Sequence, residues 1–304
     1  MSREIISGKD ILETILLVLL AVGTVFCHPK NWERFSFWLS GVRRFYPATN
    51  VNPNAETAAQ ACSWSANEKT KEDCARKFLS YTLEARMQIL DGYLRKRWVP
   101  EITVSGVDRL DVGLAAGKGV ILWVVPTLFS DLVTKMEFNQ LGYQVNHLSR
   151  PAHGYSVTRY GIACLNPVKI SIEERHVAGR VVLHDHEEAK AVLQLRKLLR
   201  KNAVVSITVM SNPASQGLVR GMGLGLRVST GPLRLSATTG APLLPVFTMR
   251  KDDGSYHVVI EDPLIHGENS RKKGNWSEEL QRFSDMLEKQ IVLDPIQLRY
   301  SYLG

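Results

Sequence analysis

From residue 119 onward, short apolar runs alternate with longer amphipathic stretches. The first run, Gly-Val-Ile-Leu-Trp-Val-Val at 119–125, predicts a strand that is buried on both faces. Further strands are predicted at 143–148, 203–209, 242–248 and 255–260, and helices at 128–141, 187–201, 230–239 and 276–291. This alternation predicts an α/β fold with a single mixed sheet flanked by helices, in which binding sites gather where strands end.

An apolar stretch at 11–27 precedes this pattern, and residues 69–97 have the apolar spacing of a long amphipathic helix. A helix over 11–27 would be about 25 Å long, slightly less than the roughly 30 Å hydrocarbon core of a bilayer. A secretory signal peptide is disfavoured, because the charges before the stretch cancel and 28–32 is a poor cleavage site. Aromatic and basic side chains are interleaved at 30–46, which suits the headgroup layer of a membrane.

We therefore predict an N-terminal apolar membrane-anchor helix with a basic-aromatic collar over residues 1–50, and the α/β domain over residues 51–304. The basic residues that follow the helix would keep this domain on the cytoplasmic side. The sequence leaves open whether the helix spans the membrane or lies in it. A hydrophobic helix packed on the protein core is the alternative.

The net charge favours an anionic partner. The chain has 38 Lys and Arg against 30 Asp and Glu, a formal charge of +8. No recognition-helix or zinc-finger pattern accompanies these cations, so a phospholipid membrane is preferred to nucleic acid. The four cysteines are scattered and predict reduced thiols rather than a disulfide framework.

Four short motifs follow one another in the predicted α/β domain: Gly117-Lys-Gly119-Val, Arg150-Pro151, Thr230-Gly231-Pro232 and Gly240-Ala-Pro-Leu-Leu-Pro-Val-Phe. Their order and spacing, after an apolar amino terminus, resemble the bacterial lipid A biosynthesis (lauroyl/myristoyl) acyltransferases of the lysophospholipid acyltransferase superfamily. The resemblance implies transfer of an acyl chain to a hydroxyl of a lipid or glycolipid at the cytoplasmic face of the bacterial inner membrane. Acyl carrier protein or acyl-CoA would be the donor co-substrate. We expect no bound cofactor, no metal and no nucleic-acid partner.

The catalytic motif of that family, His-x4-Asp/Glu, is incomplete here. Asp131 supplies the acid, but Pro126 stands in the position of the His. The family's His takes the proton of the acceptor hydroxyl, and the acid fixes its tautomer. We consider His147 and His153 as replacement bases beside Asp131. An acid at the start of a helix is also explained by the helix dipole alone, and both interpretations of Asp131 stay open.

The resemblance also implies residues that bind the substrate. Arg150, in the Arg-Pro pair after the second strand, is the first candidate for a phosphate contact. Arg175 and Arg180 fall near a basic site residue of the family. Arg220 and Arg227 flank a glycine-rich segment within 210–229, which is predicted to be a flexible loop. Thr230 or its neighbour would cap the following helix, whose free N–H groups could bind a phosphate.

A second departure from the family lies after the strand at 203–209, where the expected acid is absent and Ser211-Asn212 follows. Two functions remain. One is a membrane-associated acyltransferase with a rearranged site. The other is a non-catalytic relative that binds a lipid or an acyl carrier protein.

Overall fold

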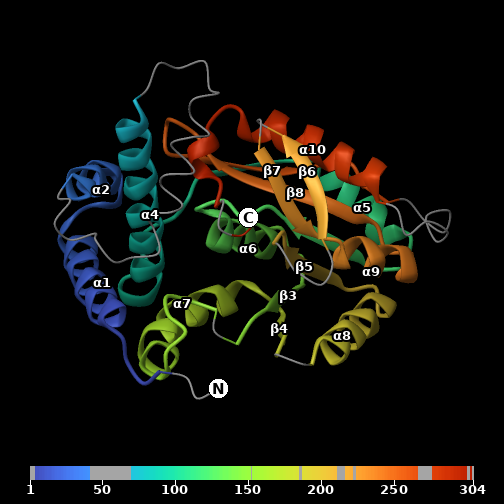
Figure 1. Ribbon diagram of the computed structural model, residues 1–304, viewed down its shortest axis with the longest axis horizontal. Coiled ribbons are helices and arrows are strands. Elements are labelled where there is room, and N and C mark those ends of the chain that lie inside the picture. Colours follow the sequence, from blue (N-terminus) through green and yellow to red (C-terminus); the bar gives the residue numbers. More distant parts are fainter. Residues whose placement is uncertain are drawn as a thin grey trace. The chain divides into compact units, whose positions relative to one another are not determined.

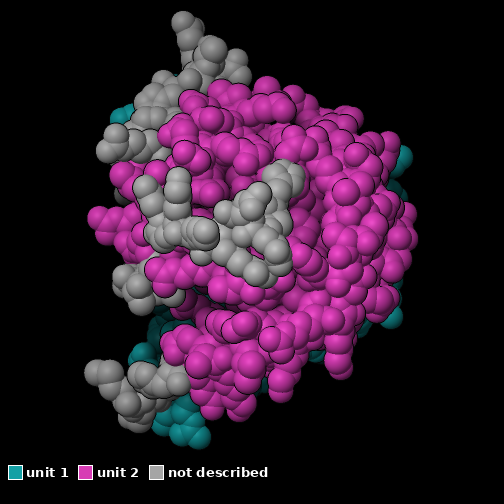
Figure 2. All heavy atoms as spheres, turned by 90° about the vertical axis from the view of Figure 1, so that its right-hand side faces the viewer, with its two compact units in different colours: residues 1–100, 152–175, 294–297 teal, residues 101–151, 176–293, 298–304 magenta. Residues whose placement is uncertain are grey.

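The computed structural model describes residues 4–41, 70–151, 153–184, 187–210, 216–221, 224–265, 276–299 and 302. The chain divides into two compact units, which Figure 2 shows in different colours. Unit 1 consists of residues 1–100, 152–175 and 294–297, and unit 2 of residues 101–151, 176–293 and 298–304. The predicted boundary between residues 50 and 51, and the collar residues at 43–46, lie outside the described residues.

Unit 2 is built on a seven-stranded sheet with the order β1-β9-β8-β2-β5-β3-β4. Of these strands, Figure 1 labels β3, β4, β5 and β8. The strands are β1 (Ile102–Ser105), β2 (Val120–Val124), β3 (Val145–Ser149), β4 (Gly179–Val182), β5 (Val204–Thr208), β8 (Leu243–Arg250) and β9 (Tyr256–Ile260). All neighbouring strands are parallel except β8 and β9, which are antiparallel. The predicted mixed α/β sheet is confirmed.

The helices of unit 2 are α5 (Val107–Ala115), α6 (Ser130–Gln140), α8 (Glu188–Arg200), α9 (Gly231–Thr239) and α10 (Ser277–Ile291). All five residues of β2 are buried, which explains its continuous apolar sequence. Val124 lines a cavity together with residues of α6, whereas Trp123 packs on Phe283 of α10, with ring centroids 4.5 Å apart. Because successive side chains of a strand point to opposite faces, α6 and α10 cover opposite faces of the sheet.

Three of the four family-like motifs have a local structural role. Gly119 enters β2 with φ +69°, and a Cβ there would lie 2.6 Å from the carbonyl oxygen of Ala203. Gly231 and Pro232 begin α9, and Gly240 ends it with φ +76° while its N–H bonds the carbonyl of Ser236 at 2.8 Å. A left-handed residue at a helix end is the usual place for glycine. The residues of these motifs therefore have roles in the backbone of the fold, and the motifs by themselves do not indicate a catalytic activity.

The segment at 210–229 is predicted to be a flexible loop, but its described residues 216–221 and 224–229 form strands. It contains an antiparallel hairpin of β6 (Gln216–Gly221) and β7 (Leu224–Ser229), and β6 packs against α10. In β7, Leu226 and Val228 are buried while Arg227 between them is exposed. This period-two alternation is the strand signal that the glycine-rich composition obscures.

Unit 1 is helical. Its main helices are α1 (Gly8–Phe26), α2 (Trp32–Ser40), α4 (Lys71–Leu94) and α7 (Asn166–Glu173), with short helical turns at Pro29–Asn31, Gly161–Leu165 and Pro295–Gln297. The predicted helix at 69–97 is confirmed as α4. The helices share a buried apolar cluster of Leu16, Leu17, Leu20, Trp32, Leu39, Leu83, Met87, Leu90 and Leu165.

The prediction of an N-terminal apolar membrane-anchor helix is wrong for α1. The helix forms over the apolar stretch, but its first two turns carry Lys9, Asp10 and Glu13. Among the described residues, no helix combines the length and the apolar character needed to cross a bilayer. One face of α1 packs on α4, as the core-helix alternative expects, because Leu16, Leu17 and Leu20 belong to the buried cluster.

Candidate functional site

The loop in the position of the family motif leads from β2 into α6. Pro126 offers a backbone carbonyl, which accepts a hydrogen bond from the N–H of Arg299 at 2.8 Å. The hydroxyl of Ser130 accepts the N–H of Thr127 at 3.1 Å and donates to the carbonyl of Thr127 at 3.0 Å. Asp131 lies in the first turn of α6, where the helix dipole favours a negative charge.

Asp131 is paired with Arg299 from the C-terminal segment of unit 2. The guanidinium Nη1 lies 2.6 Å from Oδ2 of Asp131, and Nη2 donates to the carbonyl of Leu128 at 3.0 Å. Leu298 also forms an isolated antiparallel bridge with Thr127. Burial alone would lower the pKa of Arg299, but Asp131 and then Tyr302 raise it, so the guanidinium stays charged. Backbone and side-chain hydrogen bonds of Arg299 thus hold the C-terminal segment against the loop between β2 and α6.

A small cavity of about 20 Å³ lies beside Asp131 in unit 2, which is room for about one water molecule or one hydroxyl group. Its polar lining comes from Ser130, Asp131, Thr134 and Lys135 of α6, His147 of β3, and Ser206 and Thr208 of β5. Of the residues that line the cavity, Val124 and Thr208 end β2 and β5, at the edge where α/β sheets commonly form sites, whereas Val145 begins β3. Asp131 and His147, two of the predicted catalytic residues, therefore border one cavity.

His147 is buried and is held by the neighbouring strand. It faces Ser206 in the β3–β5 register, and its Nδ1 lies 2.8 Å from the hydroxyl oxygen of Ser206. If Nδ1 donates to Ser206, then Nε2 is the proton acceptor of the ring. If Ser206 donates instead, Nε2 carries the proton. His147 can act as a base only in the first tautomer.

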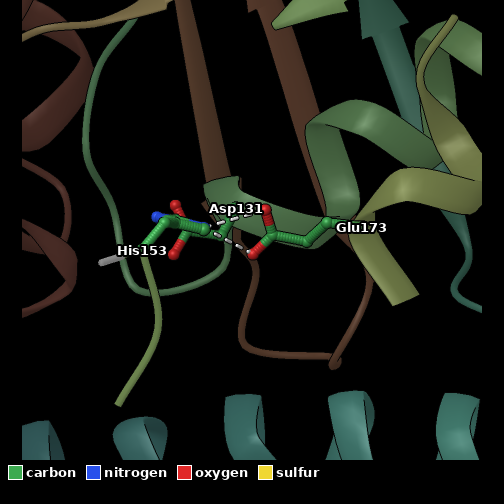
Figure 3. A group of neighbouring side chains, drawn as sticks. All are labelled: Asp131, His153 and Glu173. Carbon is green, nitrogen blue, oxygen red and sulfur yellow. Dashed lines mark hydrogen bonds and ion pairs between the residues drawn. The ribbon is translucent and has the colours of Figure 1, made fainter. Parts of the chain in front are cut away.

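His153, the other predicted base, forms a dyad with Glu173 in unit 1 (Figure 3). Its Nε2 lies 3.1 Å from Oε1 and 3.0 Å from Oε2 of Glu173, which is the last residue of α7. Asp131, which Figure 3 also labels, belongs to unit 2. An ionised carboxylate only accepts hydrogen bonds, so Nε2 of His153 carries the proton and Nδ1 is the basic nitrogen. This is the relation between histidine and acid that a general base requires.

Charged groups surround the dyad within unit 1. Lys169 lies one turn before Glu173 on α7 and pairs with it at 3.6 Å. Arg86 of α4 pairs with Glu13 of α1 at 2.7 Å, and its guanidinium lies 5.5 Å from the ring centroid of Tyr155. Burial raises the pKa of Tyr155 to about 12.

Two of the predicted phosphate-binding arginines lie at one end of β3. Arg150 follows the last residue of that strand and is exposed. Arg180 of β4 donates to the hydroxyl of Ser149 at 2.9 Å. The side chain of Arg180 thus reaches the last residue of β3, which directly precedes Arg150 in the chain.

The other predicted binding residues are spread over different elements. Arg175 donates to the carbonyl of Gly92 at 2.8 Å and so ties the end of α7 to α4 within unit 1. Arg227 is exposed on β7. Arg220 belongs to β6, and its side chain lies outside the described residues. Thr230 is at the N-cap of α9 and is buried, but its side chain does not cap the helix, and Ser229 accepts the N–H of Gly231 instead.

Three residues that shape these sites were not predicted. Ser206 is one polar residue inside an apolar strand, and its register with His147 is a property of the sheet rather than of the local sequence. Glu173 is 20 residues from His153, and Arg299 is 168 residues from Asp131. Their only sequence signals are the polar interruption of a buried strand and the i,i+4 spacing of Lys169 and Glu173.

Comparison with known proteins adds no identification. No protein-family model matches this chain, and no curated protein matches it at a significant level.

Proposed function

We propose that this protein is an acyltransferase of the membrane lipid class, with His153 in the role that the family resemblance assigns to the position of Pro126. It would move an acyl chain from an acyl carrier protein or acyl-CoA thioester to a hydroxyl of a lipid or glycolipid, at the cytoplasmic face of a bacterial inner membrane. The single observation that carries this proposal is the dyad of His153 and Glu173, with Nε2 within 3.1 Å of both carboxylate oxygens.

The proposed reaction needs one base and no redox chemistry. Nδ1 of His153 takes the proton of the acceptor hydroxyl while the hydroxyl oxygen attacks the thioester carbonyl. A C–O bond forms, the C–S bond breaks, and the departing thiolate takes the proton back from the imidazolium to become a thiol. Glu173 stabilises the imidazolium while it exists. The family resemblance also assigns a phosphate contact to Arg150 and Arg180, which belong to unit 2.

The second candidate function is binding without chemistry. It is favoured by the ion pair of Asp131 and Arg299, because the acid that should orient a histidine is occupied by a cation at 2.6 Å. A protein of this kind would keep the fold and bind an acylated lipid or an acyl carrier protein.

The test is acyl transfer by the purified full chain in detergent, with radiolabelled acyl-CoA and acyl carrier protein thioesters and a panel of hydroxylated lipids. We expect turnover by the wild type and a fall of at least about 100-fold in His153→Gln, the size typical for a lost general base. His257→Gln is the matched control, because His257 is a strand histidine of unit 2 that bonds Ser105 at 3.1 Å and does not belong to the dyad of His153 and Glu173. If His153→Gln leaves turnover intact, His153 is not the base. A loss of turnover in His147→Gln would then identify His147 as the base.

Glu173→Gln separates a positioning role from a structural one. Loss of the carboxylate removes the group that orients the ring and stabilises the imidazolium, so kcat should fall while KM and the unfolding midpoint stay close to those of the wild type. A merely structural defect would lower the unfolding midpoint together with the activity. If the wild type turns over no donor but still binds a labelled acyl lipid, the catalytic proposal is wrong and the binding function stands.

A further inference from the structure

The polarity of α1 is inverted relative to a helix on the surface of a water-soluble protein. Its acidic side chains face the protein interior. Asp10 is buried and accepts hydrogen bonds from the N–H of Ser7 at 2.7 Å and the hydroxyl of Thr158 at 2.9 Å. Glu13 is buried and pairs with Arg86 of α4. Lys9 in the first turn is the one exposed charged residue of α1, and its outward face carries no charge from Ile11 onward.

The outward face of α1 is a continuous apolar stripe. Its six residues are between 40% and 82% exposed: Ile11, Ile15, Val18, Leu19, Val22 and Phe26. At the angular spacing of an α-helix they fall in a band roughly 100° wide. The band is about 22 Å long, from the rise per residue of a helix. Isolated exposed apolar residues are ordinary, but an aligned set of six marks an interaction surface, for a membrane or for another protein.

Cationic and aromatic residues follow this stripe directly in unit 1. Lys30 and Arg34 are exposed in the turn and helix after α1, and Trp38 of α2 is 64% exposed. In Figure 1, α1 and α2 are neighbouring elements that both lie along α4. A tryptophan and cations beside an apolar helix face are complementary to the headgroups and phosphates of an anionic bilayer.

We infer that unit 1 is a membrane-docking module in which α1 lies in the plane of an anionic bilayer. The stripe of α1 enters the boundary between headgroups and acyl chains, while Lys30 and Arg34 contact lipid phosphates. A helix that lies in the interface needs neither the length nor the uniform apolarity of a spanning helix. This inference goes beyond acyl transfer and does not depend on it.

The inference is tested by vesicle flotation of the full chain, from which the detergent has first been removed. The vesicles contain phosphatidylcholine either alone or in equal parts with phosphatidylglycerol. We expect the wild type to float with the mixed vesicles and more weakly with pure phosphatidylcholine. The double variant Val18→Asn/Val22→Asn should lower the partition coefficient at least about tenfold, because two apolar side chains lose their lipid contact.

The matched control is Val112→Asn/Val192→Asn, which changes two valines exposed on helices of unit 2 and should float like the wild type. Lys30→Gln/Arg34→Gln should weaken binding to the mixed vesicles by up to about thirtyfold and leave binding to phosphatidylcholine unchanged. The inference is overturned if the wild type stays in the bottom fraction, or if stripe and control variants float equally. It is also overturned if the wild type does not bind vesicles and sedimentation velocity shows that the stripe variant converts a dimer to a monomer. The stripe would then be a dimer interface.

Trp38 provides an independent readout. Brominated phospholipids should quench part of the tryptophan fluorescence of the wild type, and Trp38→Phe should remove that part. Quenching that is unchanged in Trp38→Phe would place α2 away from the bilayer and contradict the proposed orientation.

Discussion

Arg299 and Asp131 form an ion pair of 2.6 Å that joins the C-terminal segment of unit 2 to the first turn of α6. The side chain of Arg299 is 19% exposed and that of Asp131 is 13% exposed, so both charges are largely removed from water. In a pair of this kind, the cost of leaving one charge alone exceeds the net value of the interaction. The acid of the family motif therefore has a structural partner of its own in this protein.

Arg299→Ala should lower the free energy of unfolding by about 3 kcal/mol, because Asp131 would keep a poorly solvated charge without its partner. Arg299→Lys should lose less, since a lysine keeps the charge but cannot also reach the carbonyl of Leu128 with a planar fork. Urea denaturation measures both. Arg200→Ala, which removes an exposed cation of α8, is the control and should change stability by less than about 0.5 kcal/mol.

A double-mutant cycle on Asp131 and Arg299 tests whether the two side chains interact in solution. If the role of Asp131 is to hold Arg299, Asp131→Asn/Arg299→Ala should be less destabilised than the sum of the two single variants. Strict additivity would show that the two side chains do not interact in solution, and it would restore Asp131 as a candidate for orienting a base.

Asp10 should make folding sensitive to acid. Burial raises its pKa, but hydrogen bonds from Ser156, Ser7 and Thr158 together bring it below its ordinary value. A carboxyl with a lowered folded-state pKa contributes stability above the unfolded-state pKa, about 3.9, and loses it as pH falls through the folded value. Asp10→Asn should therefore destabilise the protein by about 2 kcal/mol near neutral pH, and the difference should shrink below about pH 4.

Asp252→Asn is the control for this titration, because Asp252 lies exposed in a turn. Unfolding free energies of the three proteins across acidic pH give the comparison. A gap between wild type and Asp10→Asn that stays constant down to the acid limit would show that Asp10 does not titrate as its hydrogen bonds predict.

Most of unit 2 was predictable because its signals are local. The apolar run of β2 and the amphipathic pattern of α10 each lie within one short segment, so their residues indicate the element directly. The short strands β1 and β4 were missed, because only alternate residues of β1 are partly buried and β4 has a single buried residue. Hydrogen bonds to β9 and β3 place these strands in the sheet, and a local sequence does not contain its partner.

The candidate site was predictable only in part, for the same reason. His147 was identifiable near the end of a predicted strand and His153 just after it, but their partners Ser206 and Glu173 come from β5 and α7. The tautomer of each ring depends on that partner, so the chemistry could not be derived from the histidines alone. The sequence shows Pro126 where the resembled family has a His, whereas the pairing of Asp131 with Arg299 follows from the path of the C-terminal segment.

The hydroxyl of Tyr155 leads to a prediction that runs against the usual effect of deleting a polar group. Within the described part of the chain this buried oxygen has no hydrogen-bond partner. Its pKa of about 12 results first from burial, with Arg86 and Lys169 lowering it and Glu13 and Glu173 raising it. A buried polar group without a partner costs free energy, so Tyr155→Phe should leave stability unchanged or raise it by about 1 kcal/mol.

Tyr143→Phe is the matched comparison, since the hydroxyl of Tyr143 donates to Asp111 at 2.6 Å. That variant should lose up to about 1 kcal/mol because a formed hydrogen bond disappears. Thermal and urea unfolding of both variants measure the contrast. A loss in Tyr155→Phe as large as in Tyr143→Phe would mean that water or another group satisfies the hydroxyl in solution. A higher free energy of unfolding in Tyr155→Phe would mean that the hydroxyl, two residues from His153, is not there for stability. Acyl transfer by Tyr155→Phe would then show whether the hydroxyl takes part in catalysis.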